Sequence, residues 1–194
     1  MNKLAIACAL LLAGGCASHA EQRVVGGGTT DTCKADVLDA SYDAKTGVQD
    51  CTDALNFQPM SLRDRIATTV NRGTLRSRAG DLNGAYADFS SAISMNDRYG
   101  QAYLDRSATL LGLRRYAQAK SDADMAIKYN ARPPEVAYYN RAAAEEGLGD
   151  IQSAYHDYKM AVQIQPEFTA AKNELTRFKV TSGGNGSGGG GGTM

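Results

Sequence analysis

The chain of 194 residues has no tryptophan, few aromatic residues (7%) and no excess of charge of either sign, because 21 Lys and Arg balance 21 Asp and Glu. The scarcity of large aromatic side chains argues against a deep globular core and favours helices that pack closely through small side chains. The zero net charge provides no bulk electrostatic attraction to nucleic acid or to an anionic membrane surface. We therefore expect no nucleic-acid partner.

The chain also lacks the residue arrangements of common enzymes. It contains no serine in a nucleophile-elbow context, no His-Glu-x-x-His motif and no glycine-rich loop ending in Lys-Ser or Lys-Thr. Its two histidines are His19, near the N-terminus, and His156, which we place outward on a helix as a solvated residue. Glu145 and Glu146 are adjacent, so on a helix they point about 100° apart and cannot act as a facing pair. We expect neither an enzyme nor a cofactor or metal site.

The first apolar run is short and lies at the N-terminus. It covers Leu4–Ala13, follows Lys3, and is too short to span a bilayer, so residues 1–20 are predicted to be a signal peptide. Two processing alternatives stay open. The residues before Cys16 resemble the lipobox of bacterial lipoproteins, with alanine three residues before the cysteine where leucine is usual, which predicts lipidation of Cys16. Cleavage after Ala20 is the other alternative.

Either alternative predicts export to the bacterial periplasm or envelope. Lipidation would also attach the chain to a membrane, the outer membrane being the expected one, through its N-terminal lipid. No later run in the sequence is long enough to predict a transmembrane helix.

The central part of the chain repeats three times. With Ile66, Gly100 and Glu135 as first positions, the blocks are offset by 34 and then 35 residues, which is the length of a helix-turn-helix repeat. Small residues recur at the eighth, twentieth and twenty-seventh positions, and mostly bulky ones recur at the fourth, twenty-fourth and twenty-eighth. The eighth-position residues are Gly73, Ser107 and Ala142.

This pattern resembles the tetratricopeptide repeat (TPR) family over more than half of the chain. The resemblance implies an all-α helix-turn-helix solenoid. Three clear repeats are expected at residues 62–99, 100–134 and 135–166. Ser61 and Asp64 form a capping-box-like start that should begin the first of these helices about one turn early.

The turns inside the repeats differ in sequence. Gly80-Asp81 and Gly149-Asp150 supply glycines that suit a positive φ, whereas Arg114-Arg115 occupies the same place in the middle repeat. We therefore expect the middle turn to have a different conformation.

The N-terminal flank is predicted to hold a degenerate fourth repeat. Pro59 matches Pro166 in the register, and counting back from it gives Gly28 as the first position. The degenerate repeat is predicted at residues 31–61. Residues 21–30 before it are polar and glycine-rich and are predicted to be a flexible tether.

The C-terminal flank should close the array. Phe168, Ala171, Leu175 and Phe178 recur at helical spacing within residues 167–180, which predicts a capping helix. Residues 181–194 are nearly all Gly, Ser, Asn and Thr and are predicted to be a disordered tail.

Two kinds of cross-helix pair follow from the register. Two antiparallel helices bring together residues whose position numbers within the repeat add up to the same total. An arginine at the seventh position and an aspartate at the twenty-third recur in all three clear repeats, so we interpret them as structural ion pairs: Arg72 with Asp88, Arg106 with Asp122, and Arg141 with Asp157. Lys34 and Asp50 occupy those positions in the degenerate repeat. Cys33 and Cys51 have the same sum, which predicts a disulfide in an exported chain, although the register leaves the directions of the two side chains open.

TPR arrays bind partners mostly on the concave face built from the first helix of each repeat. The family register implies the following partner-groove residues here: Val70, Asn71, Arg78, Gln101, Leu104, Asp105, Tyr139, Asn140 and Glu146. The sixth-position residues Asn71, Asp105 and Asn140 form a polar ladder that could hydrogen-bond an extended ligand. Some family members bind a C-terminal carboxylate through a lysine clamp, but Val70 and Val136 replace the matching lysines, so we do not expect that activity.

The sequence therefore predicts an exported scaffold or adaptor that holds a peptide or helix of an unidentified protein partner in its groove. A structural spacer in an envelope assembly or secretion complex is one alternative, and a regulatory accessory of a cell-wall enzyme is another. Groove binding requires Asn71, Tyr139 and Asn140 to be exposed on one face. End-to-end stacking requires an uncovered apolar patch on the C-terminal helix.

Overall fold

The structure, a computed structural model, describes Cys33, Val37, Ser41 and residues 43–178. Several predicted features lie outside these residues: the signal peptide at 1–20 with Cys16, the tether at 21–30, Lys34 and the tail at 181–194.

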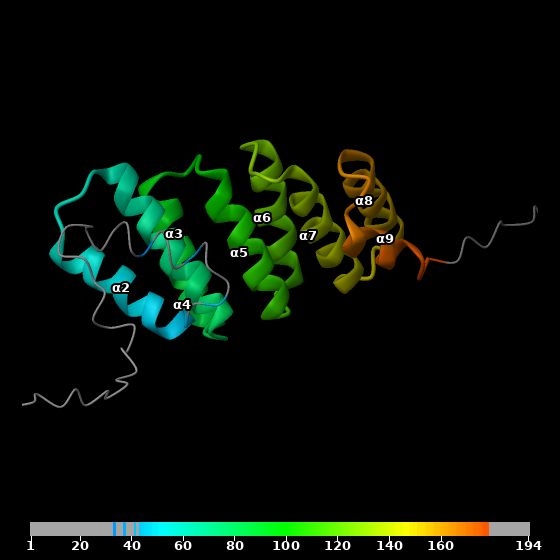
Figure 1. The fold of residues 1–194 in the computed structure, drawn as a ribbon. Coiled ribbons are helices and arrows are strands. Elements are labelled where there is room, and N and C mark those ends of the chain that lie inside the picture. Colours follow the sequence, from blue (N-terminus) through cyan, green and yellow to red (C-terminus); the bar gives the residue numbers. More distant parts are fainter. Residues whose placement is uncertain (1–32, 34–36, 38–40, 42, 179–194) are drawn as a thin grey trace, which may run out of the picture.

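The described chain forms helices that follow one another in chain order along a single row (Figure 1). The predicted all-α class is confirmed, because no strand occurs among the described residues. None of these helices is both long and apolar enough to cross a bilayer. The helices are α2 (Ala44–Phe57), α3 (Leu62–Arg78), α4 (Leu82–Met95), α5 (Gly100–Gly112), α6 (Tyr116–Lys128), α7 (Pro134–Gly147), α8 (Ile151–Ile164) and α9 (Thr169–Leu175).

Three helix pairs, α3 with α4, α5 with α6 and α7 with α8, form the core of the row. The predicted early start of α3 is confirmed, since the backbone N–H of Asp64 donates to the Ser61 hydroxyl at 3.1 Å and the helix begins at Leu62. Asp81 and Asp150 cap α4 and α8 in the same way.

The expectation for the middle turn was wrong. Gly80 and Gly149 have φ values of +83° and +84°, and Arg114 takes the same left-handed conformation with φ of +57°. The following residue donates to a carbonyl five positions back in all three turns: Asp81 to Arg76, Arg115 to Leu110 and Asp150 to Glu145. The helix-terminating hydrogen bonds therefore impose one backbone geometry even where the sequence has no glycine.

Small side chains at the register positions allow the helices to approach closely. A Cβ added at Gly73 would lie 2.7 Å from the Phe89 ring, which no real contact tolerates. Ser107 and Ala142, at the same register position, are fully buried. The bulky member of each contact thus occupies the space that the small member leaves.

The arginine-aspartate interpretation is confirmed in every clear repeat. Arg106 donates to both carboxylate oxygens of Asp122 at 2.7 and 2.8 Å, and Arg141 binds Asp157 through the same two-pronged geometry. Arg72 binds Asp88 likewise, and Arg76 adds a third donor to Asp88 at 2.8 Å. These pairs link the two helices of each repeat at nearly buried positions.

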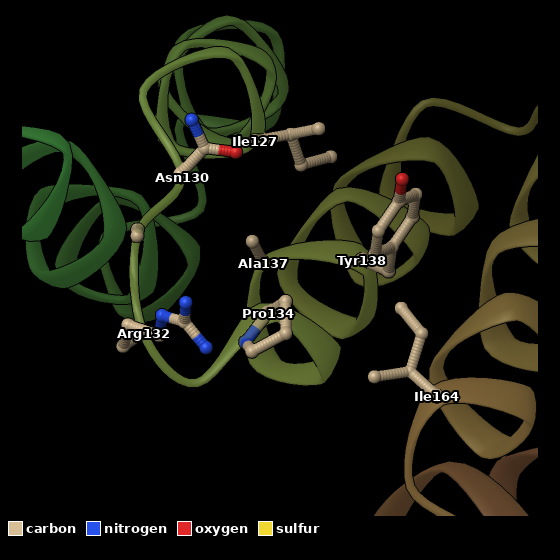
Figure 2. Close-up of a pocket in the computed structure, with 8 residues that line it drawn as sticks. Ile127, Asn130, Arg132, Pro134, Ala137, Tyr138 and Ile164 are labelled. Atoms are coloured by element: carbon tan, nitrogen blue, oxygen red, sulfur yellow. The ribbon is translucent and has the colours of Figure 1, made fainter.

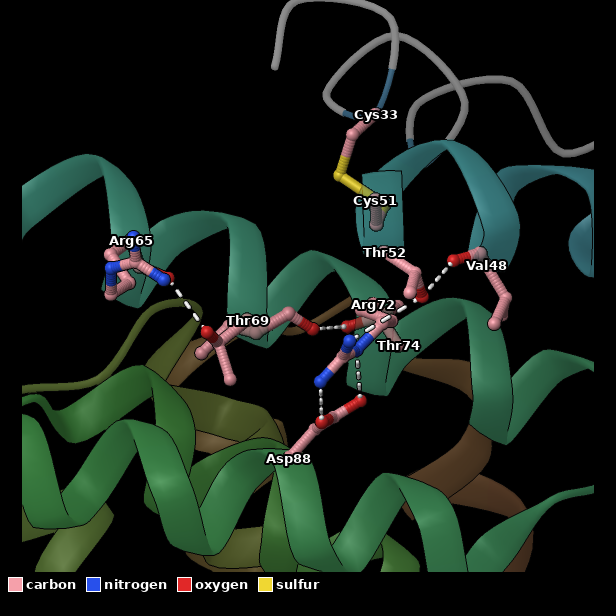
Figure 3. Close-up of a disulfide and its surroundings, with 10 residues drawn as sticks. Cys33, Val48, Cys51, Thr52, Arg65, Thr69, Arg72, Thr74 and Asp88 are labelled. Atoms are coloured by element: carbon pink, nitrogen blue, oxygen red, sulfur yellow. Dashed lines mark hydrogen bonds and ion pairs between the residues drawn. A yellow bond between two sulfur atoms is a disulfide. The ribbon is translucent and has the colours of Figure 1, made fainter. Parts of the chain in front are cut away.

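The predicted disulfide between Cys33 and Cys51 is present, with the two Cα atoms 4.8 Å apart (Figure 3). Both cysteines are fully buried beside Leu75 of α3. Arg72 continues this N-terminal contact, because its guanidinium donates to the Thr52 hydroxyl of α2 as well as to Asp88 (Figure 3). The N-terminal unit is therefore covalently closed and joined to the first clear repeat.

The C-terminal cap is shorter than predicted, since α9 covers only Thr169–Leu175. Its apolar spacing behaves as expected: Ala171 is buried, and Phe168, Leu175 and Phe178 pack against the cluster that contains Tyr158. The large hydrophobic residues exposed on the described part of the chain lie elsewhere: Phe57, Leu62, Leu148, Ile151, Met160 and Ile164. The described part of the C-terminal helix thus lacks the apolar patch that end-to-end stacking requires.

Candidate functional site

The first helices of the repeats, α3, α5 and α7, line one face of the row, which we call the inner face. α5 packs directly against α7 and contacts α3, so these helices stand closer together than the second helices α4, α6 and α8 do. Closer spacing on one side curves a solenoid toward that side and makes this face the concave one.

Three of the predicted groove residues are buried in the packing between helices. Val70, Leu104 and Asn140 have exposed fractions of 5%, 3% and 4%. The Asn140 amide donates to the Ser107 hydroxyl at 2.8 Å and thereby joins α7 to α5. The expectation that Asn140 is exposed was wrong, because the hydroxyl of Ser107 on α5 accepts a hydrogen bond from its amide.

The C-terminal cap partly covers two more of the predicted groove residues, Tyr139 and Glu146. Tyr139 is half-buried, with its ring 5.4 Å from the Phe168 ring and 5.5 Å from the Tyr158 ring. Glu146 accepts hydrogen bonds from the Tyr158 hydroxyl at 3.1 Å and from Arg177 at 2.7 Å. Burial raises the pKa of the Tyr139 phenol, and the nearby charges of Glu174 and Glu146 raise it further. The inner face is therefore closed over α7.

The predicted residues that stay accessible belong to α3 and α5. Arg78, at the C-terminal end of α3, is exposed and donates to the Val37 carbonyl at 3.3 Å. Asn71, Gln101 and Asp105 are half-buried. Of these, Gln101 and Asp105 interact directly, with the Gln101 amide donating to the Asp105 carboxylate at 3.0 Å.

Asp105 differs from Asp88, Asp122 and Asp157 because it has no ion-pair partner among the described residues. Asp88, Asp122 and Asp157 each meet an arginine. Burial raises the pKa of the Asp105 carboxyl to about 6, and the hydrogen bond from Gln101 only partly opposes the rise. The charged form of the Asp105 carboxyl is thus disfavoured by burial, and the amide of Gln101 is a neutral donor that compensates for this only in part.

This raised pKa predicts a pH dependence of stability. Because the folded-state pKa of Asp105 lies near 6 and the ordinary value is 3.8, the folded protein binds more protons in that window, and its free energy of unfolding falls as pH rises through it. Wild type is therefore expected to lose on the order of 2 kcal/mol of its free energy of unfolding between pH 4 and pH 7, and Asp105→Asn should not show this loss. The measurement is urea unfolding of both proteins at pH 4, 5, 6 and 7.

The difference between the two proteins isolates Asp105. Glu145 also has a raised pKa, caused first by burial and then by the charge of Asp157, and its contribution has the same sign in both proteins. A difference between wild type and variant that stays constant from pH 4 to pH 7 would contradict the prediction.

A pocket of about 440 Å³ lies at the start of α3 and the end of α4. Its lining residues are Leu62, Arg63, Ile66, Ala67, Met95, Asn96 and Tyr99. Tyr99 connects the pocket to the carboxylate: burial raises the pKa of its phenol, the charge of Asp105 raises it further, and that of Arg63 lowers it. Arg63 and Tyr99 thus line a largely apolar pocket, and Tyr99 is within reach of the charge of Asp105.

A second pocket, of about 300 Å³, lies where α6 ends and α7 begins, against the end of α8. Figure 2 shows Tyr138 and Ile164 on one side of it and Asn130 on the other, with Pro134 and Ala137 between them. Arg132 is the charged residue in its lining. None of the predicted groove residues lines either pocket.

The register missed the larger of these two pockets, at the start of α3, for a geometric reason. Leu62 and Arg63 precede the first position of the repeat, because α3 begins one turn early. Met95 and Tyr99 belong to the end of α4 and the link to α5. The capping signal at Ser61 was the one sequence feature that indicated an extended first helix and hence an additional surface there.

No family model matches the chain. Among curated proteins, heat shock protein STI1 of Saccharomyces cerevisiae is 33% identical over 112 residues, which cover 57% of this chain and 19% of that protein. The chain spans less than a third of the length of the curated relatives that it matches.

Two solved structures illustrate the structural likeness. MamA (residues 41 to the end) from Desulfovibrio magneticus RS-1 matches with a TM-score of 0.64 and 16% identity over 77% of this chain and 82% of that chain. The first TPR domain of Spaghetti bound to the HSP90 peptide SRMEEVD matches with a TM-score of 0.55 and 23% identity over 58% of this chain and 88% of that chain. The chain therefore has the TPR solenoid fold that its repeats predicted.

Proposed function

From this fold we infer that the chain is an interaction scaffold that binds a peptide segment of a protein partner on the inner face over α3 and α5. The observation that carries the inference is the pocket of about 440 Å³ at the edge of this face, where Ile66 and Ala67 of α3 meet Met95 of α4 and Tyr99 before α5. It combines apolar lining with a few converging polar groups, which is the usual make-up of a recognition site. The cap closes the inner face over α7, so the accessible part of the face is limited to the first two clear repeats.

The likeness to a TPR domain with a bound HSP90 peptide supports peptide recognition as the type of activity. The sequence of that peptide, SRMEEVD, is rich in carboxylates, whereas this chain has valine where the family register would place clamp lysines. The partner of this chain is therefore proposed to be a different peptide.

We further propose that this scaffold acts in the bacterial envelope or periplasm after export, with or without a lipid on Cys16. Support comes from the signal-like N-terminal sequence and from the buried Cys33–Cys51 disulfide, because structural disulfides persist mainly in oxidising compartments. Mass spectrometry of the mature N-terminus distinguishes lipidation from cleavage after Ala20.

Site-specific photo-crosslinking in the source cells tests the scaffold proposal. A photoreactive phenylalanine replaces Ala67, which is exposed at the pocket, and in a control protein it replaces His156, which is exposed on the second helix α8. We expect a discrete adduct from the Ala67 position that disappears when Gln101→Trp fills the adjacent surface. Equal capture from both positions, or an Ala67 adduct that survives Gln101→Trp, would contradict recognition on the inner face.

A further inference from the structure

The surroundings of Asp105 favour a cationic partner that the described residues do not supply. Asp88 receives two arginines, Asp122 receives Arg106, and Asp157 receives Arg141. Asp105 is poorly solvated yet receives only the neutral amide of Gln101. A carboxylate withdrawn from water gains most from a cation that can also donate hydrogen bonds.

No cation of the part of the chain that the structure describes fills this role. Arg63 is the charged residue that lines the adjacent pocket; its charge acts on Tyr99, and it forms no ion pair among the described residues. Gln101 and Tyr99, the other polar neighbours, are neutral near pH 7. The carboxylate of Asp105 therefore remains available to a ligand.

The pocket adds a second requirement. Leu62, Ile66 and Met95 supply apolar lining, and Leu62 is 60% exposed, so an apolar side chain bound there would cover surface that now faces water. Arg63 places a positive charge at the pocket, which disfavours a second cation on that side. The ligand's cation is thus directed to Asp105 and its apolar group to the pocket.

We propose that Asp105 binds a lysine or arginine side chain of the peptide, and that a neighbouring large apolar side chain of the same peptide fills the pocket over Leu62, Ile66 and Met95. This inference rests on the proposed function, because it specifies the chemistry of the peptide that the inner face binds. It assigns to this chain a preference opposite in charge to the acidic SRMEEVD peptide of its structural neighbour.

A selection from a random dodecapeptide display library tests the preference. The targets are the purified folded chain, Asp105→Asn, and the matched control Asp53→Asn. Asp53 is a suitable control because it makes the same type of contact, accepting from the amide of Gln49 four residues earlier at 2.8 Å, on α2 and away from the pocket. We expect wild type and Asp53→Asn to enrich peptides with Lys or Arg beside a large apolar residue, and Asp105→Asn to lose that enrichment.

A synthetic peptide from the enriched set then gives a quantitative readout. By fluorescence anisotropy we expect Asp105→Asn to weaken binding about 10- to 100-fold. Wild-type affinity should rise about tenfold between pH 5 and pH 7.5 as Asp105 loses its proton, since the peptide's cation stays charged and the raised pKa of Tyr99 keeps its phenol neutral over this range. A version of the peptide with norleucine in place of lysine should show neither effect.

The outcomes separate the two proposals. Enrichment of acidic or purely apolar peptides, or basic enrichment that Asp105→Asn leaves intact, would overturn the inference about ligand charge while leaving peptide binding in place. Enrichment of no peptide by a folded wild-type chain would overturn both. Circular dichroism of each variant verifies folding, and Asp105→Asn is expected to be at least as stable as wild type at pH 7.

Discussion

Replacing Arg106 with methionine is expected to lower the free energy of unfolding by about 3–5 kcal/mol. Arg106 supplies both strong hydrogen bonds of Asp122, at 2.7 and 2.8 Å, and the aspartate side chain is only 8% exposed. The substitution leaves a nearly buried carboxylate without a cation, and Asp122 has no other ion pair among the described residues. Urea unfolding followed by circular dichroism measures the loss.

Arg72→Met provides the matched control, because the equivalent aspartate of its repeat has a second cation. Asp88 keeps Arg76, whose guanidinium lies 2.8 Å from the carboxylate. We therefore expect Arg72→Met to cost clearly less than Arg106→Met. The double variant Arg106→Met/Asp122→Leu should recover much of the lost stability. Equal losses for the two arginine variants would show that the pairs are not the source of the effect.

Removal of the disulfide is expected to cost the N-terminal unit about 3 kcal/mol. Cys33 and Cys51 close a loop with a sequence separation of 18, and opening a loop of that size restores chain entropy to the unfolded state. The variant is Cys33→Ala/Cys51→Ala, which avoids a free thiol. Native-state hydrogen exchange should show faster exchange in α2 and little change in α8.

Reduction of the wild type provides the control for the alanine substitutions. Dithiothreitol should reproduce the α2 effect in the wild type and have no effect on the double variant. Unchanged exchange in α2 after both treatments would contradict a stabilising role for the bond.

The architecture was predictable because its determinants recur at fixed spacing. The register alone places Arg106 opposite Asp122 and Cys33 opposite Cys51, since antiparallel helices of constant offset leave little freedom. The prediction for the middle turn was wrong because the left-handed conformation does not require glycine there. The helix-terminating hydrogen bonds impose it on Arg114 as well.

The site was less predictable because exposure depends on contacts between repeats. Asn140 is buried by a hydrogen bond to Ser107, a residue of the preceding repeat, and Tyr139 is covered by the aromatic residues of the cap. Neither contact follows from the position of a residue within its own repeat. Asp105 was included among the groove residues for its position, but its lack of a cation partner is visible only in three dimensions.

The central claim, that the inner face over α3 and α5 binds a peptide, is tested most directly by an NMR titration. The isotope-labelled chain is titrated with a peptide enriched on the wild type, and the backbone amide shifts are mapped. The account predicts that the largest shifts lie at Arg63, Ala67, Tyr99, Gln101 and Asp105, and that about 10- to 100-fold more peptide is needed to reach half of them in Asp105→Asn. Shifts centred instead on the exposed Leu148 and Ile151 at the turn between α7 and α8 would contradict it.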